Sequence, residues 1–307
     1  NIRLSKSVIG TAEKNAVQKV LENEYLGMGE ETKIFERQLS DFFGRSAVCV
    51  SNGTAALHLS IQACGIGPGD EVIAPSLTYI SSYQAISATG ASITPCDVLA
   101  DTLTIDPTDA ERRVNDKTKA IMPVHYAGGV GRLTDVYKLA QRYGLRVIED
   151  AAHAFGTTYS GQPIGAFGDI SCFSFDGIKN ITSGEGGCVV SEDNRLIEDI
   201  RTLRLLGVEQ DTEARYRGAR TWDLQVTRQG WRYHMSNIMA SIGIEQFKRL
   251  PEFATARQQL AKHYDLMLND YPNIRPLDLD YSTVVPHIYV VRIKGLKNRE
   301  SLRENLK

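Results

Sequence analysis

The sequence predicts an α/β fold in which a mostly parallel sheet lies between helices, followed by a smaller α+β domain at the C-terminal end. Three observations support this. Short β-rich runs alternate with helical stretches along the chain. Most of these runs are almost continuously apolar, which is typical of strands covered on both faces. The helical stretches end at a glycine, which adopts a left-handed cap at low cost.

The strands and helices can be placed in chain order. We expect strands at AVCV (47–50), EVIAPS (71–76), SITPCDV (92–98), KAIMPVHY (119–126), LRVIEDAA (145–152), DISCFSF (169–175) and GGCVVS (186–191). The helices between them include TAALHLSIQACG, ISSYQAISATG and RLTDVYKLAQRYG. Strands connected through helices in this way run parallel in one sheet.

The second part of the chain has a different pattern. From Glu209 to Gly230 it is highly charged with little apolar periodicity, so we expect a long surface loop. It then becomes helical and, at HIYVVRI (287–293), strand-like. We predict a large domain over 1–234, which includes the N-terminal segment, and a smaller C-terminal domain over 235–307. The smaller domain reads as incomplete, and we expect any missing tail to lie outside the ligand site.

Composition excludes several classes of protein. The 307 residues include 42% hydrophobic and 23% charged side chains, as in ordinary soluble globular proteins. With 35 basic and 37 acidic residues the net charge is -2, which predicts no binding to nucleic acid or to an anionic membrane. There is no signal-peptide pattern and no run near the ~20 apolar residues of a membrane helix. We expect a cytoplasmic protein.

The cysteines point to neither disulfides nor metal. They are odd in number and form no C-x-x-C pair, which argues against a disulfide framework and against a zinc site. We expect buried, reduced thiols at Cys49, Cys64, Cys96, Cys172 and Cys188.

The first candidate site is the turn Ser51-Asn52-Gly53-Thr54-Ala55-Ala56, between a predicted strand and a predicted helix. Backbone N–H groups at a helix start, with the positive end of the helix dipole behind them, form a seat for phosphate. The alternative is a plain N-cap by Asn52 or Thr54.

The second candidate site is Glu149-Asp150-Ala151-Ala152-His153, at the carboxyl end of a predicted strand. Ligands of open α/β sheets gather at that end, so a carboxylate there faces the crevice. The alternative is a salt bridge or a helix cap, because buried acids need partners. If a helix starts here, His153 lies one turn from Asp150.

The third candidate site is Lys179, in a loop that follows a buried strand and precedes TSGEGG. Partial desolvation lowers the pKa of such a lysine, as an amine nucleophile requires. The alternative is an ordinary solvated surface lysine.

Together the three sites fit one cofactor, pyridoxal 5'-phosphate (PLP). PLP needs an anchor for its phosphate, a carboxylate to keep its ring nitrogen protonated and a lysine to hold its aldehyde as an imine. The G-x-G-x-x-G turn of a dinucleotide-binding fold and the G-x-x-x-x-G-K-[ST] loop of nucleotide triphosphatases are both absent from the sequence.

Ordered blocks over nearly the whole chain resemble the DegT/DnrJ/EryC1/StrS sugar aminotransferases, which have PLP fold type I, as in aspartate aminotransferase. The blocks are EYLGMGEETKIFE, SNGTAALHLSIQACGIGPGDEVIAPSLTY, TKAIMPVHYAG, VIEDAAHAFG, GDISCFSFDGIKNITSGEGG and GWRYHMSNIMASIGIEQ. The resemblance implies a PLP-dependent transaminase.

The resemblance also implies roles for single residues. Lys179 is expected to form the imine with PLP and to move the proton between donor and cofactor. Asp150 is expected to pair with the ring nitrogen. His153 is at the position where the family places His or Gln near the ring. Tyr79 is at the position of an aromatic that stacks on the ring, for which the alternative is core packing.

The phosphate group and the neighbouring subunit complete the implied site. The resemblance places Thr54, Ala55 and Ser174 on the phosphate, next to the Gly53 turn. The family usually reads G-Y-N-Y-R-M where this chain has Gly-Trp-Arg-Tyr-His-Met at 230–235, so Arg232 replaces an asparagine that reaches the phosphate of the neighbouring subunit's cofactor. Arginine can also bond phosphate, or it can turn to the substrate's diphosphate. The resemblance implies a homodimer with shared active sites.

The implied reaction moves an amino group from L-glutamate to the ketone of a nucleotide-linked keto-deoxysugar. Our expectation is C4 amination of a dTDP-4-keto-6-deoxyhexose for O-antigen, lipopolysaccharide or a similar surface glycan. C3 amination and UDP- or GDP-linked sugars are the alternatives. A cation for the diphosphate or the donor carboxylate is expected among Arg204, Arg217, Arg220, Arg228 and Arg232.

Other functions are open on sequence grounds. Some relatives are dehydratases that replace the lysine with histidine, and Lys179 speaks against that. A PLP-binding regulator would bind the cofactor without releasing 2-oxoglutarate from glutamate. An α/β protein that binds another phosphate ligand at Gly53 would show no imine absorbance.

Overall fold

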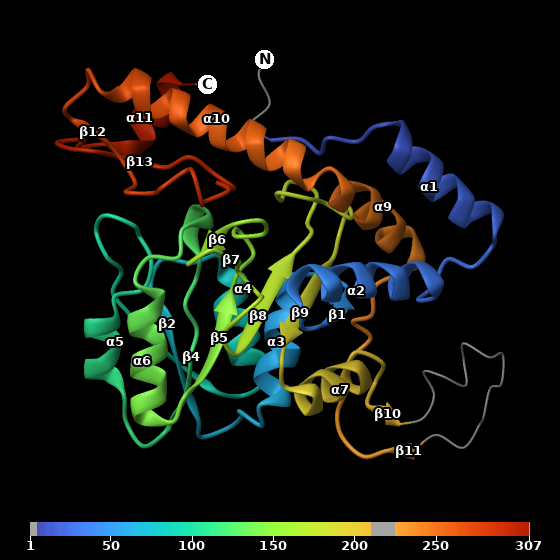
Figure 1. Cartoon of the computed structure of the whole chain (residues 1–307). Coiled ribbons are helices and arrows are strands. Elements are labelled where there is room, and N and C mark those ends of the chain that lie inside the picture. Colours follow the sequence, from blue (N-terminus) through green and yellow to red (C-terminus); the bar gives the residue numbers. More distant parts are fainter. Residues whose placement is uncertain (1–4, 210–224, 307) are drawn as a thin grey trace.

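The computed structural model describes residues 5–209 and 225–306. Its centre is a seven-stranded sheet of order β1-β9-β8-β5-β4-β2-β3 (Figure 1). The seven strands predicted between residues 47 and 191 form this sheet, as β1 (Ser46–Val50), β2 (Glu71–Pro75), β3 (Ser92–Cys96), β4 (Thr118–Ile121), β5 (Arg146–Asp150), β8 (Ile170–Ser174) and β9 (Gly187–Ser191). β9 runs antiparallel to both of its neighbours, β1 and β8, and every other pair of adjacent strands in this sheet is parallel. The predicted mostly parallel sheet is confirmed.

The three helices expected between the strands are present as α3 (Gly53–Ala63), α4 (Ile80–Ala88) and α6 (Leu133–Tyr143). Gly144 ends α6 in the left-handed conformation, with φ 65°. At the other two ends the cap residue is right-handed and the left-handed glycine follows one residue later. The remaining helices of the sheet layers are α2 (Glu30–Phe43), α5 (Pro107–Arg113) and α7 (Asn194–Leu203).

Both faces of the sheet are buried, which explains the continuous apolar runs. Val48 and Val50 of β1 pack in one cluster with Leu59 of α3, and Ala47 and Cys49 pack in another with Phe35 of α2. Neighbouring residues of a strand point to opposite faces, so each face of β1 needs apolar side chains. The cysteines are free thiols, and all except Cys64 are buried.

The C-terminal part begins with α9 (Asn237–Lys248), which packs against α1 (Thr11–Glu22) and α2, and continues into α10 (Leu250–Leu268) (Figure 1). Ala240 and Ile244 of α9 are buried in the same cluster as Phe35. A domain boundary at residue 235 stays a prediction. A two-stranded sheet of β12 (Ile274–Pro276) and β13 (Val291–Ile293) and the helix α11 (Arg299–Asn305) follow.

Two further sequence predictions concern residues 287–293 and 209–230. The strand predicted at 287–293 is shorter, because regular pairing starts only at Val291. The surface loop predicted over 209–230 falls mainly on residues outside the described ranges. Its two ends pair as β10 (Val208–Glu209) and β11 (Gln225–Val226). A further hairpin of β6 (Thr158–Tyr159) and β7 (Gln162–Pro163) follows β5. Across 5–209 and 225–306, no helix combines the length and apolar character needed to cross a bilayer.

Candidate active site

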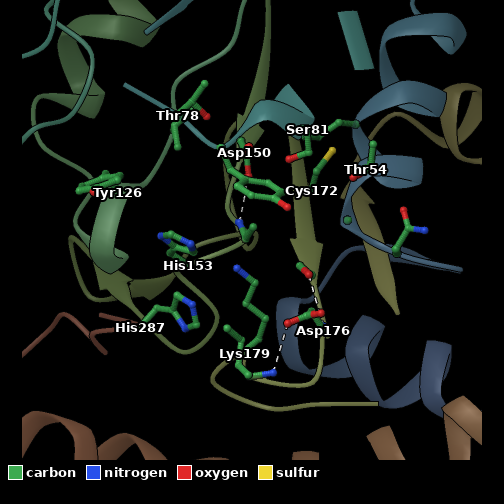
Figure 2. Close-up of a pocket in the computed structure, with 18 of the residues that line it drawn as sticks. Thr54, Thr78, Ser81, Tyr126, Asp150, His153, Cys172, Asp176, Lys179 and His287 are labelled. Atoms are coloured by element: carbon green, nitrogen blue, oxygen red, sulfur yellow. Dashed lines mark hydrogen bonds between the residues drawn. The ribbon is translucent and has the colours of Figure 1, made fainter. Parts of the chain in front are cut away.

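A cavity of about 650 Å³ lies at the carboxyl ends of the parallel strands. It brings together seven of the predicted site residues, namely Gly53, Thr54, Tyr79, Asp150, His153, Ser174 and Lys179. Figure 2 shows Lys179 extending toward His153 and Asp150. The carboxyl ends of β1, β2, β5 and β8 therefore supply one site, as the rule for open α/β sheets predicts.

The turn before α3 is a helix cap that also leaves two backbone donors unused. Asn52 Oδ1 accepts the Ala55 N–H at 2.8 Å, so the expected N-cap exists. The N–H groups of Gly53 and Thr54 form no hydrogen bond within the described chain. A Cβ on Gly53 would lie 2.9 Å from Ser174 Cβ, so only glycine allows this close approach. Two free donors at the start of α3, beside the Ser174 hydroxyl, suit a phosphate.

Ala55 corrects one prediction. It does not line the cavity, and its N–H already bonds Asn52, so it has no free backbone donor for a phosphate. The capping side chain takes the donor of the third residue after it, which is the usual geometry of an N-cap. The donors that remain for a phosphate at this turn are the N–H groups of Gly53 and Thr54 and the hydroxyl of Ser174.

The two acidic residues that end β5 point to opposite sides. Glu149 is fully buried and bonds His125 and Tyr137, which is the salt-bridge alternative considered for this segment. Asp150 is 5% exposed and faces the cavity. Its oxygens accept the Ser82 hydroxyl at 2.7 Å and the Ala152 N–H at 3.2 Å, and it forms no salt bridge within the described residues. The Asp150 carboxyl group therefore faces the cavity with no charged partner among the described residues.

Lys179 lies in a tight turn after β8. Its N–H donates to the carbonyl of Asp176, and the neighbouring Ile178 N–H donates to the Asp176 carboxylate. Its ammonium group has no hydrogen bond or salt bridge to the described residues. Burial lowers the pKa of Lys179 from its ordinary value, and the charges of Asp150 and Asp176 oppose that shift. This is the desolvated amine that a nucleophilic lysine needs.

His153 reaches the cavity from a turn rather than from a helix. Residues 151–157 form successive turns with bonds from Ala154 to Ala151 and from Thr157 to Ala154, so the conditional helical spacing from Asp150 is wrong. The His153 Nδ1 atom is buried and has no hydrogen-bond partner in the described chain. Burial, and then the charge of Lys179, lower its pKa to about 3. The ring is therefore neutral at pH 7.

Tyr79 is 74% exposed and lines the mouth of the cavity. The alternative of core packing is wrong. It is the N-cap residue of α4, and its ring is free to cover a planar ligand.

Sequence reasoning missed several residues of the cavity. His287 was included in a predicted strand, yet it lines the cavity with its ring 4.4 Å from that of His153. Tyr126 also lines the cavity. Ser82 does not line it, but its hydroxyl donates a hydrogen bond to Asp150. The HIYVVRI run carried a strand signal that concealed His287. Nothing in the sequence links Ser82 to a residue 68 positions away.

The predicted arginine cations lie elsewhere. Arg204 is 2% exposed and bonds Glu36 and the Cys49 carbonyl, so it is part of the core and not of the substrate site. Arg228 pairs with Asp199 on the surface. Neither lines the cavity. Arg217 and Arg220 lie outside the described residues.

Arg232 is exposed and does not line the cavity of its own chain. Its backbone forms a bridge with Leu205, beside the end of α7. The predicted contact of Arg232 with the cofactor of a neighbouring subunit, or with the substrate diphosphate, stays a prediction.

Comparison with known proteins decides the family. Residues 7–307 match the model of the DegT/DnrJ/EryC1/StrS aminotransferase family. The chain belongs to this family. The spore coat polysaccharide biosynthesis protein SpsC of Bacillus subtilis is 38% identical over 295 residues, which cover 95% of this chain and 76% of SpsC.

Solved structures of similar proteins agree. The putative sugar aminotransferase Spr1654 of Streptococcus pneumoniae, in its PMP form, has a TM-score of 0.91 at 30% identity, covering 100% of this chain and 81% of that one. DesV of S. venezuelae, in complex with a ketimine intermediate, has a TM-score of 0.87 at 34% identity, covering 96% and 76%. The family resemblance and the fold predicted from the sequence are confirmed.

As a member of this aminotransferase family, the protein is a PLP-dependent transferase. The residues present fit that cofactor. Gly53 and Thr54 offer unused N–H donors for its phosphate, Asp150 offers an unpaired carboxylate for its ring nitrogen, and Lys179 offers a desolvated amine for its aldehyde. The predictions of enzyme class and cofactor are confirmed.

Proposed function

We propose that this aminotransferase moves an amino group from L-glutamate to the ketone of a nucleotide-linked keto-deoxysugar. The first substrate to test is a dTDP-4-keto-6-deoxyhexose aminated at C4, and the product would serve O-antigen or a similar surface polysaccharide. SpsC, named for spore coat polysaccharide, and Spr1654, named as a sugar aminotransferase, support a sugar substrate. The observation that carries the proposal is the meeting of Lys179, Asp150 and the Gly53 turn in one cavity.

When bound, PLP acts as an electron sink and carries the amino group between the two substrates. We assign two roles to Lys179: its Nζ would hold the cofactor aldehyde, and it would move the proton from the donor's α-carbon. Its lowered pKa increases the fraction of neutral amine, which is the form that accepts a proton. Lys179 lines the cavity together with Asp150 and His153.

Three other residues of the cavity would position the ring of the cofactor. Asp150 is assigned to the ring nitrogen, where an ionised carboxylate keeps the nitrogen protonated. His153, neutral because of its burial, borders the ring without adding positive charge beside Lys179. Tyr79 is assigned to cover the ring and to exclude water at the cavity mouth.

The phosphate is assigned to the N-terminal end of α3. The N–H groups of Gly53 and Thr54 and the hydroxyl of Ser174 donate to it, and the helix dipole adds a positive field. Because the described cavity contains no arginine, we assign the recognition of substrate anions to a second subunit. The enzyme is thus proposed to be a homodimer, with Arg232 reaching the neighbouring cofactor or the substrate diphosphate.

The test is turnover with a substrate panel. Purified protein with PLP and L-glutamate is given dTDP-, UDP- and GDP-linked 4-keto and 3-keto sugars, and 2-oxoglutarate and amino sugar are measured. We expect continuous release of 2-oxoglutarate only with a keto-sugar, fastest with the dTDP-linked 4-keto compound. A single release without turnover on any sugar would contradict the sugar proposal, and no release at all would favour a PLP-binding regulator.

A further inference from the structure

A chain of two hydroxyl groups stands behind the carboxylate of Asp150. Ser82, on the first turns of α4, is fully buried, and its Oγ lies 2.7 Å from Asp150 Oδ2. Thr78 Oγ1 lies 2.6 Å from the same Ser82 oxygen. Ser82 does not line the cavity, whereas Thr78 does, as do Asp150 and Lys179. The contacts thus run from the cavity wall, through the interior, to Asp150.

The direction of these hydrogen bonds follows from chemistry. An ionised carboxylate can only accept, so Ser82 donates its one proton to Asp150. Ser82 then has no proton left for Thr78, and Thr78 donates to Ser82. The order Thr78 to Ser82 to Asp150 is therefore fixed, and in a buried chain each bond polarises and strengthens the next.

The second oxygen of Asp150 is also occupied. Oδ1 accepts the Ala152 N–H at 3.2 Å, so both oxygens are held and the carboxylate has a fixed orientation. Hydrogen bonds donated to a carboxylate favour its charged form. The only other ionisable groups lining the cavity that carry positive charge when protonated are Lys179, His153 and His287, and none bonds Asp150 within the described chain.

We propose that Ser82 and Thr78 are positioning residues, which aim the Asp150 carboxylate into the cavity and fix its orientation. The inference rests on the proposed pairing of Asp150 with the cofactor's ring nitrogen. Without Ser82 the Asp150 carboxylate loses one hydrogen bond and is free to turn, so it holds a protonated ring nitrogen less well. Thr78 acts on Asp150 only through Ser82.

The experiment compares Ser82→Ala, Thr78→Val, Thr78→Ser and the double variant Ser82→Ala/Thr78→Val. The dissociation constant for PLP is measured by titration of the visible absorbance band, and the glutamate half-reaction by stopped-flow loss of that band. Ser60→Ala is the matched control, because Ser60 has a buried hydroxyl that bonds Ala56 and Cys172 but not Asp150.

We expect Ser82→Ala to weaken PLP binding and to slow the half-reaction each by about tenfold, the loss of one hydrogen bond to a charged group. Thr78→Val should cost about threefold, and Thr78→Ser should restore wild-type values because it keeps the hydroxyl. The double variant should equal Ser82→Ala alone, since Thr78 has no other route to Asp150. Ser60→Ala should match the wild type, and melting temperatures confirm folding.

Wild-type affinity and rate in Ser82→Ala, or additive losses in the double variant, would overturn the inference. If Ser82→Ala does not fold, Thr78→Val against Thr78→Ser gives the same decision. Asp150→Asn separates this result from the function itself. If Asp150→Asn loses PLP affinity and half-reaction rate while Ser82→Ala keeps both, only the positioning role is rejected. If Asp150→Asn keeps both, the proposed role of Asp150 itself is rejected.

Discussion

The imidazole rings of His153 and His287 lie 4.4 Å apart, tilted by 38°, beside Lys179. Each has a buried Nδ1 without a hydrogen-bond partner in the described chain. Burial is the largest cause of their lowered pKa values, about 3 for His153 and about 2 for His287, and the charge of Lys179 lowers both further. Two neutral rings therefore border the reactive amine, and they come from segments far apart in the chain.

This pair predicts a pH dependence of stability. A histidine has a pKa near 6.5 in the unfolded chain. The folded values are lower, so below about pH 6.5 the unfolded state binds more protons and stability falls as the pH falls toward the folded values. Each ring contributes up to about 1.4 kcal/mol per pH unit in that range. The measurement is the free energy of unfolding of PLP-free protein between pH 7 and 5.

His287→Asn should make this pH slope shallower by about one proton. His263→Asn is the control, because His263 is exposed on α10. An unchanged slope in His287→Asn would mean that its ring protonates in the folded state at ordinary pH, contrary to the burial described.

Substitution of Arg204 is expected to lower stability rather than substrate affinity. It shares the buried Glu36 carboxylate with Arg201 and also bonds the Cys49 carbonyl. Arg204→Met leaves Glu36 without its most buried partner, so the free energy of unfolding should fall by about 3 kcal/mol. Arg228→Met, which breaks a surface pair with Asp199, should cost at most about 1 kcal/mol. If Arg204→Met raises the KM without lowering the free energy of unfolding, Arg204 contacts the substrate and this account is contradicted.

Arg257 links two segments of the site, those that contain His287 and Lys179. From α10 its guanidinium donates to the carbonyls of His287 at 3.1 Å and of Lys179 at 3.5 Å. Lysine cannot span both acceptors, so Arg257→Lys should slow the glutamate half-reaction by about tenfold. Arg249→Lys, at the start of the same helix and bonded to Glu13, should leave the rate unchanged. Equal rates in both variants by stopped-flow absorbance would reject this role.

The shared site predicts complementation between inactive subunits. If Arg232 serves the neighbouring cofactor, Lys179→Ala and Arg232→Ala are each inactive, yet a mixed dimer contains one intact site. Random mixing should restore about a quarter of wild-type activity, since half the dimers are mixed and each has one site in two. The measurement is turnover before and after unfolding and refolding the mixture. No recovery would place Arg232 outside the neighbouring site.

The sheet could be predicted from the sequence because burial of both faces leaves continuous apolar runs. Helix α2 was not predicted, although Phe35, Leu39 and Phe43 recur at helical spacing and all are buried. The strand predicted from residue 287 was too long for a different reason. The His287 N–H bonds the Ala127 carbonyl, and its own carbonyl accepts from Arg257, so these groups do not join a strand ladder. Such tertiary bonds leave no local pattern.

Within the site, residues at or shortly after the carboxyl ends of strands were predictable. Gly53, Asp150, Ser174 and Lys179 share the carboxyl edge of one sheet, which the topology brings together. Residues that enter the site through side-chain contacts were not predictable. His287, Ser82 and Arg257 reach the site through the packing of distant segments. Arg204 lies outside the site because its ion pair with Glu36 holds it in the core.

The most direct test of the central claim is an absorbance spectrum of the protein with PLP before and after L-glutamate, beside Lys179→Ala. The wild type should show a visible band that glutamate converts to a near-ultraviolet band, with release of one 2-oxoglutarate per site. Lys179→Ala should release none. A wild-type spectrum without the visible band, or normal release by Lys179→Ala, would contradict the assignment of Lys179.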